Sequence, residues 1–128
     1  MILTLAAFTA ALSLVAGKPV TLTIIPGSPQ QFASTADLGG TRIDIGEGAL
    51  TDARHGNGPG LLIALHEVGH LTGISNEAQA TCYGLARLRP FLRRYFHMGA
   101  RRVERQFMDA RAFMRTALGA SYQCGSVR

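Results

Sequence analysis

The chain has 128 residues, of which 47% are apolar, so it can form one domain with a modest core and is not a disordered polar chain. Its formal net charge is +5, but residues 1–86 hold three basic and six acidic groups, whereas residues 87–128 hold ten arginines and two acids. There are only two cysteines and no CxxC pair, which argues against a cysteine-rich zinc site.

The first segment, residues 1–17, carries no charged side chain and ends before Lys18. It is short for a membrane span, which needs roughly 20 apolar residues. The run is typical of a secretory signal peptide, with the small residues Ala16 and Gly17 as cleavage positions, and it then predicts secretion or the cell envelope. The alternative is an apolar first helix of the domain, since no basic residue precedes the run and Pro19 lies close to any cut. A core helix would favour the cytoplasm.

Residues 18–128 are expected to form a single domain. Two strands are predicted at residues 19–26 (PVTLTIIP) and 41–46 (TRIDIG), because both runs are rich in β-branched residues. Between them, the Gly/Pro/Ser-rich residues 27–40 predict a loop. EGALTDA, which follows, predicts a helical turn, and RHGNGPG predicts a glycine-rich connector.

From residue 60 the pattern becomes helical. One helix is predicted over residues 60–71 (GLLIALHEVGHL), stopped by Gly73, and a second over residues 76–88 (NEAQATCYGLARL), ended by Pro90. The fold class expected from these elements is α+β and helix-dominated, with two or three short strands before the helix that holds both histidines.

A third helical stretch is predicted to begin near Phe91, with Gly99 bending or splitting it, and a loop-like tail GASYQCGSVR follows. The residues of its apolar side recur at three- and four-residue spacing, which indicates an amphipathic helix: Leu92, Phe96, Gly99, Val103, Phe107, Ala110, Met114 and Ala117. The polar side holds seven arginines and is interpreted as a solvated face. No nucleic-acid motif accompanies these arginines, so no nucleic acid is expected, and a weak association with anionic surfaces is the alternative role.

The motif HEVGH within the first predicted helix favours a metal site. Residues four apart lie on one face of a helix, so His66 and His70 can direct both imidazoles at one Zn²⁺ ion. Glu67 lies roughly 100° further round the helix, where it is displaced from the ion but can reach a water that the ion holds. A carboxylate at that place can act as a general base.

HEVGH resembles the signature of the zincin metallopeptidases. The longer stretch from His66 to Leu85, HEVGHLTGISNEAQATCYGL, is similar to small exported bacterial proteins of zincin type, and the late SYQC also matches. The resemblance implies a minimal zincin-like domain that hydrolyses peptide bonds in a peptide or protein substrate. It implies Zn²⁺ as cofactor, His66 and His70 as ligands, and Glu67 as catalytic base.

The third ligand is not fixed by the resemblance. Metzincins have His or Asp where this chain has Asn76, whereas NEAQA fits the NExxA pattern of gluzincins, although the gap after His70 is short. We expect Glu77 to be the third ligand, because Asn76 offers only a neutral amide oxygen. Gly73 can end the first helix in a left-handed conformation, and Asn76 can cap a second helix that begins at Glu77.

Cys82 lies five residues after Glu77, or about 140° round the same helix. If Glu77 faces the metal, Cys82 faces largely away, and a disulfide with Cys124 is predicted. Two free thiols in a reducing cytosol are the alternative.

Three classes of function remain open on the sequence alone. The first is a small exported zinc peptidase, with an intracellular zincin that cleaves one regulatory protein as a variant. The second is a zinc-bearing but catalytically weak structural or interaction module. The third is a basic binding protein with incidental histidines. A peptidase also needs a donor to the oxyanion, and the sequence offers four candidates without positioning any of them: His55, Tyr83, Tyr95 and His97.

Overall fold

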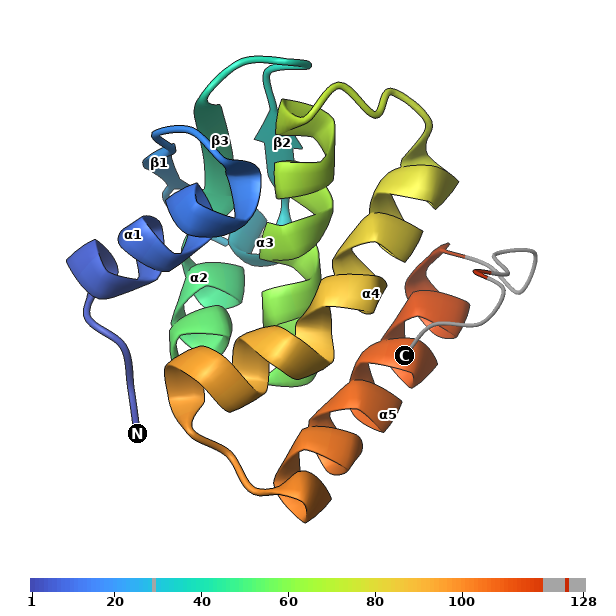
Figure 1. Cartoon of the computed structure of the whole chain (residues 1–128). Helices are drawn as coiled ribbons and strands as arrows, with labels where there is room; N and C mark the ends of the chain where they lie inside the picture. The colour runs from blue at the N-terminus through green and yellow to red at the C-terminus, as the bar shows by residue number, and fades with distance from the viewer. Residues whose placement is uncertain (29, 119–123, 125–128) are drawn as a thin grey trace.

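The computed structural model describes residues 1–28, 30–118 and 124 of the chain (Figure 1). These residues form an α+β fold dominated by helices, with a small three-stranded sheet before the helix that carries the histidines, as the sequence predicts. The elements, in chain order, are α1 (Leu5–Ala16), β1 (Thr21–Ile25), the short 3-10 helix η1 (Gln30–Phe32), β2 (Ser34–Ala36), β3 (Arg42–Gly46), α2 (Glu47–Arg54), α3 (Gly58–Leu71), α4 (Glu77–Phe96) and α5 (Ala100–Leu118).

The sheet has the strand order β1-β3-β2, with β3 parallel to β1 and antiparallel to β2. Ile43 and Ile45 of the central strand point into the core and are fully buried. The prediction of a featureless loop over residues 27–40 is wrong, because that segment contains η1 and β2. Strand β2 has only three residues, and its pairing with β3 holds it in place where its own β-propensity is weak.

Helix α1 packs against the rest of the domain through one apolar face. The Thr4 hydroxyl accepts a hydrogen bond from the amide of Ala7 and caps the helix, and Gly17 ends it in a left-handed conformation. Phe8 and Leu12 are fully buried, and the Phe8 ring meets the Phe91 ring edge-on at a centroid distance of 6.1 Å. No helix in the described ranges is long and apolar enough to cross a membrane.

Helices α3 and α4 form the centre of the fold, and in Figure 1 they run side by side with α5 along α4. Their close approach depends on Gly84, where a Cβ atom would lie only 2.9 Å from the backbone nitrogen of His66. The contact buries Leu65 and Leu88 completely. Helix α3, which carries the two histidines, therefore packs against the sheet as well as against α4.

The prediction that Pro90 ends the second helix is wrong, since α4 continues to Phe96. The last turns of α4 carry Phe91, Leu92 and Phe96, all buried, and this packing outweighs the local cost of a proline inside a helix. The break occurs after α4, where His97 adopts a left-handed conformation with φ 53°. The predicted third helix thus begins after Gly99 rather than near Phe91.

Helix α5 confirms the predicted stripe where its side chains are described. Val103, Phe107, Ala110 and Met114 are buried, while Ala117 lies outside the described side chains. The Sγ atoms of Cys82 and Cys124 are 2.05 Å apart, so the predicted disulfide is present and ties residue 124 to α4. The predicted loop-like tail, residues 119–128, otherwise lies outside the described residues.

Candidate metal centre

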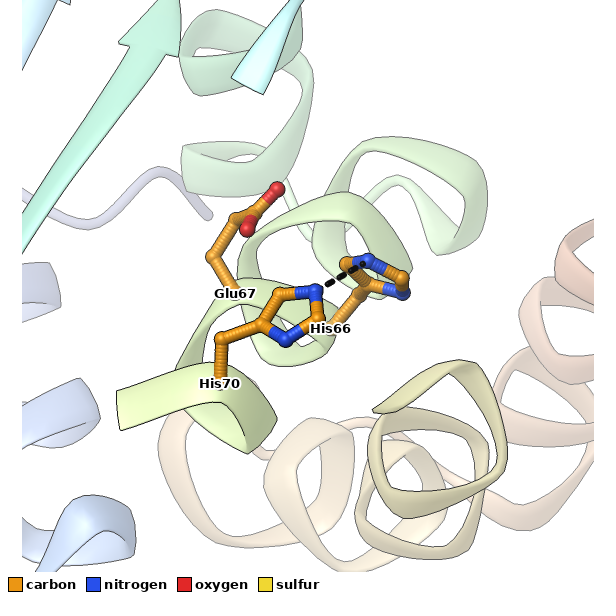
Figure 2. A group of neighbouring side chains, drawn as sticks. All are labelled: His66, Glu67 and His70. Carbon is orange, nitrogen blue, oxygen red and sulfur yellow. Dashed lines mark hydrogen bonds between the residues drawn. The ribbon is translucent and has the colours of Figure 1, made fainter. Parts of the chain in front are cut away.

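Helices α3 and α4 bring three side chains to one point. The Nε2 atoms of His66 and His70 lie 3.1 Å apart, and Figure 2 shows these two nitrogens directed toward each other from nearly perpendicular rings. The Oε1 atom of Glu77 lies 2.8 Å from Nε2 of His66 and 3.1 Å from Nε2 of His70. Two imidazole nitrogens and one carboxylate oxygen therefore form a small triangle.

The short connection between the two helices places Glu77 in this triangle. After α3 ends, Gly73 takes a left-handed conformation with φ 101°, and the chain reverses direction. The Asn76 side chain then accepts a hydrogen bond of 2.9 Å from the amide of Gln79, so α4 begins at Glu77. These three expectations from the sequence are confirmed.

The other ring nitrogen of each histidine is also engaged. Nδ1 of His70 lies 2.6 Å from the carbonyl oxygen of Ile74, which can only accept, so Nδ1 carries a proton. The protonated ring also donates from Nε2 to Glu77, whereas in the neutral ring Nε2 holds a lone pair that can bind a metal ion. Nδ1 of His66 lies 2.8 Å from the hydroxyl of Thr81, a buried residue one helical turn after Glu77. Such contacts orient histidines that bind metals.

Glu67 lies beside this triangle and is 3% exposed. The Ser34 hydroxyl donates a hydrogen bond of 2.5 Å to its Oε2 atom, which links strand β2 to helix α3. Figure 2 shows the carboxylate on one side of the paired imidazoles, directed away from the space between them. A carboxylate oxygen of Glu67 nevertheless lies within 4.8 Å of an imidazole nitrogen of each histidine, so Glu67 can reach a group held at the triangle without belonging to it.

His66, Glu67 and His70 form a group that could hold a metal ion, with ligand atoms within 4.8 Å of one another. The contacts with Glu77 are much shorter, at 2.8 and 3.1 Å. Ligand atoms around a tetrahedral Zn²⁺ at about 2.1 Å lie about 3.4 Å apart, close to the spacing that Glu77 gives. The set with Glu77 therefore fits such an ion better than the set with Glu67.

Burial and neighbouring charge separate the two carboxylates. Burial raises the pKa of Glu67 above its ordinary value, although the Ser34 hydrogen bond and the two histidines oppose that rise. Burial also acts to raise the pKa of Glu77, but its hydrogen bonds with His70 and His66 outweigh burial and lower the pKa. For His70, burial acts to lower the pKa, and the Ile74 carbonyl and Glu77 together raise it.

A cavity of about 310 Å³ opens beside these residues. Its walls come from β2, the turn after it, α3 and the start of α4, and its lining residues are Ser34, Thr35, Ala36, Leu38, Glu67, His70, Ser75 and Glu77. Strand β2 is an edge of the sheet, and in the described residues its outer side pairs with no other strand. Glu67, His70 and Glu77 therefore line a cleft that has a strand along one side.

The candidate oxyanion donors do not line this cavity. Tyr83 packs against Gly69 and lies under the Arg87 guanidinium, and Tyr95 lines a different pocket beside α1. His55 follows α2, and His97 lies at the far end of α4, about 30 Å along the helix from Glu77. The hydroxyl groups in the cavity belong to Ser34, Thr35 and Ser75.

Ser34 and Thr81 belong to the site but are not among the site residues predicted from the sequence. Thr81 lies four residues after Glu77 on the predicted second helix, so its place on the same face could have been inferred. Nothing in the sequence pairs Ser34 with Glu67, because the contact joins residues 33 apart through a strand that the sequence does not predict. No protein-family model, curated protein or solved structure matches this chain.

Proposed function

We propose that this chain is a zinc-dependent metallopeptidase. The observation that carries the proposal is the triangle formed by Nε2 of His66, Nε2 of His70 and Oε1 of Glu77, with the carboxylate of Glu67 beside it at an open cleft. Three protein ligands with one open position are typical of catalytic zinc sites, whereas structural zinc sites have four protein ligands.

The donor set suits Zn²⁺ chemically. Two imidazoles and one carboxylate are common zinc ligands, and the contacts of Nδ1 with Ile74 and Thr81 direct the Nε2 lone pairs toward one place. When bound, Zn²⁺ supplies Lewis acidity that polarises a peptide carbonyl and acidifies a water molecule. Glu67 takes the proton of the attacking water and then delivers it to the leaving amine.

A peptide is the substrate class that the cleft favours. Among the residues that the structure describes, no strand pairs with the outer edge of β2, which runs along the same cavity, and an extended peptide can add to such an edge by main-chain hydrogen bonds. Ser34 fixes the distance between this edge and Glu67 by its hydrogen bond. A bound peptide would therefore run past the base and the metal ligands.

One observation favours a catalytically weak zinc module as the second candidate. Among the described residues, the cavity lining contains no Tyr or Arg, and His70 is its only His. Oxyanion stabilisation would therefore rest on hydroxyl groups and the metal. The scaffold would then bind zinc and a peptide without rapid turnover.

The compartment and further partners are also proposals. A disulfide between Cys82 and Cys124 is compatible with an oxidising compartment, which supports secretion or the cell envelope, whereas an intracellular zincin would act on one regulatory protein in the cytoplasm. Exposed arginines on α5, among them Arg101, Arg102 and Arg105, support a weak association with anionic surfaces.

The test combines metal content with turnover. The purified full chain should contain one zinc ion per molecule and hydrolyse members of a peptide library, and chelation should abolish both, with recovery on adding Zn²⁺. Zinc without hydrolysis would favour the weak module, and a protein without zinc would refute both candidates.

A further inference from the structure

Leu38 is the one large apolar side chain among the described residues that line the cavity. The other lining residues are polar, ionisable or as small as Ala36. Leu38 is 59% exposed, although it lies in the same cavity as His70 and Glu67. An exposed leucine is common on protein surfaces, so its meaning depends on what holds it there.

The turn that carries Leu38 is fastened to the end of α3. The amide of Gly39 donates a hydrogen bond of 2.9 Å to the carbonyl of His70. The ammonium group of Lys18 donates to the carbonyl of Gly39 at 3.0 Å and to the carbonyl of Leu71 at 2.6 Å. The backbone next to Leu38 is therefore tied to the end of α3 by bonds to His70 and Leu71.

Lys18 is the only lysine of the chain, and both of its acceptors are backbone carbonyls. Leu71 is the last residue of α3, where unpaired carbonyls and the helix dipole favour a cation. The same ammonium reaches the carbonyl directly after Leu38. One side chain thus joins the end of α1, the turn after β2 and the end of the histidine helix.

We infer that Leu38 selects peptide substrates with a large apolar side chain next to the cleaved bond, and that Lys18 is a positioning residue that holds Leu38 in place. A substrate side chain that covers Leu38 removes apolar surface of both partners from water, whereas a small or charged side chain does not. Because the tether holds the backbone of the turn that carries Leu38, that backbone loses little conformational freedom on binding. This inference rests on the proposed peptidase function.

The experiment compares two peptides that differ only in one residue next to the scissile bond, leucine or alanine. The ratio of kcat/KM for the two peptides is measured with wild type, Leu38→Ser and the control Leu14→Ser, which changes a leucine that is 66% exposed outside this cavity. The binding affinities of the two labelled peptides are measured separately by fluorescence anisotropy, and their ratio is taken. This measurement uses zinc-loaded Glu67→Gln protein, alone and combined with Leu38→Ser or Leu14→Ser. Zinc content is determined for every variant.

Wild type should favour the leucine peptide by roughly tenfold, as apolar contacts in enzyme pockets do. Leu38→Ser should bring both ratios close to one with zinc content unchanged, and Leu14→Ser should behave as wild type. Lys18→Met should reduce both ratios, and Lys18→Arg should restore them, because arginine keeps the charge and the donors.

The outcomes separate this inference from the peptidase proposal. Suppose that the wild type hydrolyses no peptide, while Glu67→Gln binds the leucine peptide more tightly than the alanine peptide and loses this preference with Leu38→Ser. Apolar selection then stands and the peptidase proposal fails. If peptides are hydrolysed and Leu38→Ser leaves the kcat/KM ratio and the affinity ratio unchanged, selection by Leu38 is refuted. Absence of any preference in wild type, or of any peptide binding, refutes it equally.

Discussion

One oxygen of Glu77 contacts both imidazoles of the motif, 2.8 Å from His66 and 3.1 Å from His70, across a helical hairpin in which His66 and Glu77 are only eleven residues apart. A carboxylate shared in this way stands where a single cation could bind all three groups.

Glu77→Gln is expected to weaken Zn²⁺ binding by more than about 100-fold, since loss of a ligand exceeds the 10- to 100-fold effects of residues behind the ligands. Asn76→Ala is the matched control on the adjacent residue. It removes the helix cap and should lower the free energy of unfolding by about 1 kcal/mol while zinc affinity changes little. Titration calorimetry and urea unfolding measure the two quantities. Loss of zinc in Asn76→Ala with retention in Glu77→Gln would instead indicate a metzincin-like site.

Glu67→Gln should retain zinc, because neither imidazole nor Glu77 is changed and the amide oxygen of glutamine can still accept the Ser34 hydrogen bond. Turnover should fall by about 10²- to 10⁴-fold, which is the usual contribution of a general base. Hydrolysis rates and metal analysis of the same preparation provide the check. Wild-type turnover in this variant would show that Glu67 is not the base.

Thr81→Val replaces the hydroxyl beside His66 with a methyl group of similar volume. The imidazole loses the partner of its Nδ1 atom, and zinc affinity should fall by about 10- to 100-fold. Thr116→Val on the exposed side of α5 is the control and should leave affinity unchanged. Competition with a chromophoric chelator measures both variants, and equal affinities would show that Thr81 does not orient the ligand.

The double variant Cys82→Ser/Cys124→Ser removes a disulfide that spans a sequence separation of 42 residues. Its free energy of unfolding should fall by up to about 4 kcal/mol, because the open chain regains the entropy that the closed loop lacks. Denaturant unfolding measures the change. Mass spectrometry of unreduced wild type after alkylation should find no free thiol, and two alkylated cysteines would contradict the bond.

The triangle of His66, His70 and Glu77 could be predicted from the sequence because its geometry is local. Spacing of four residues on one helix, a glycine that reverses the chain and an asparagine cap are enough to direct Glu77 toward His66 and His70. The apolar periodicity of residues 103–114 likewise needs no tertiary knowledge. In each case the sequence pattern that carries the prediction lies within one helix or one helical hairpin.

Apart from the disulfide, which follows from there being only two cysteines, features that depend on distant contacts could not be predicted. Strand β2 exists through its pairing with β3, and α4 continues past Pro90 because Phe91 and Phe96 pack into the core. The hydrogen bonds of Ser34 with Glu67 and of Lys18 with Leu71 join residues 33 and 53 positions apart. Sequence spacing carries no signal for such pairs.

This division between local and distant contacts has a consequence for the order of folding. The helical hairpin from α3 to α4 contains every proposed ligand, so zinc can be captured as soon as that hairpin forms, at a small cost in loop closure. The approach of Ser34 to Glu67 requires the sheet to dock on α3, a step with longer loops. We therefore expect refolding protein to acquire zinc before it acquires turnover, and the delay between the two signals would report the docking of the sheet.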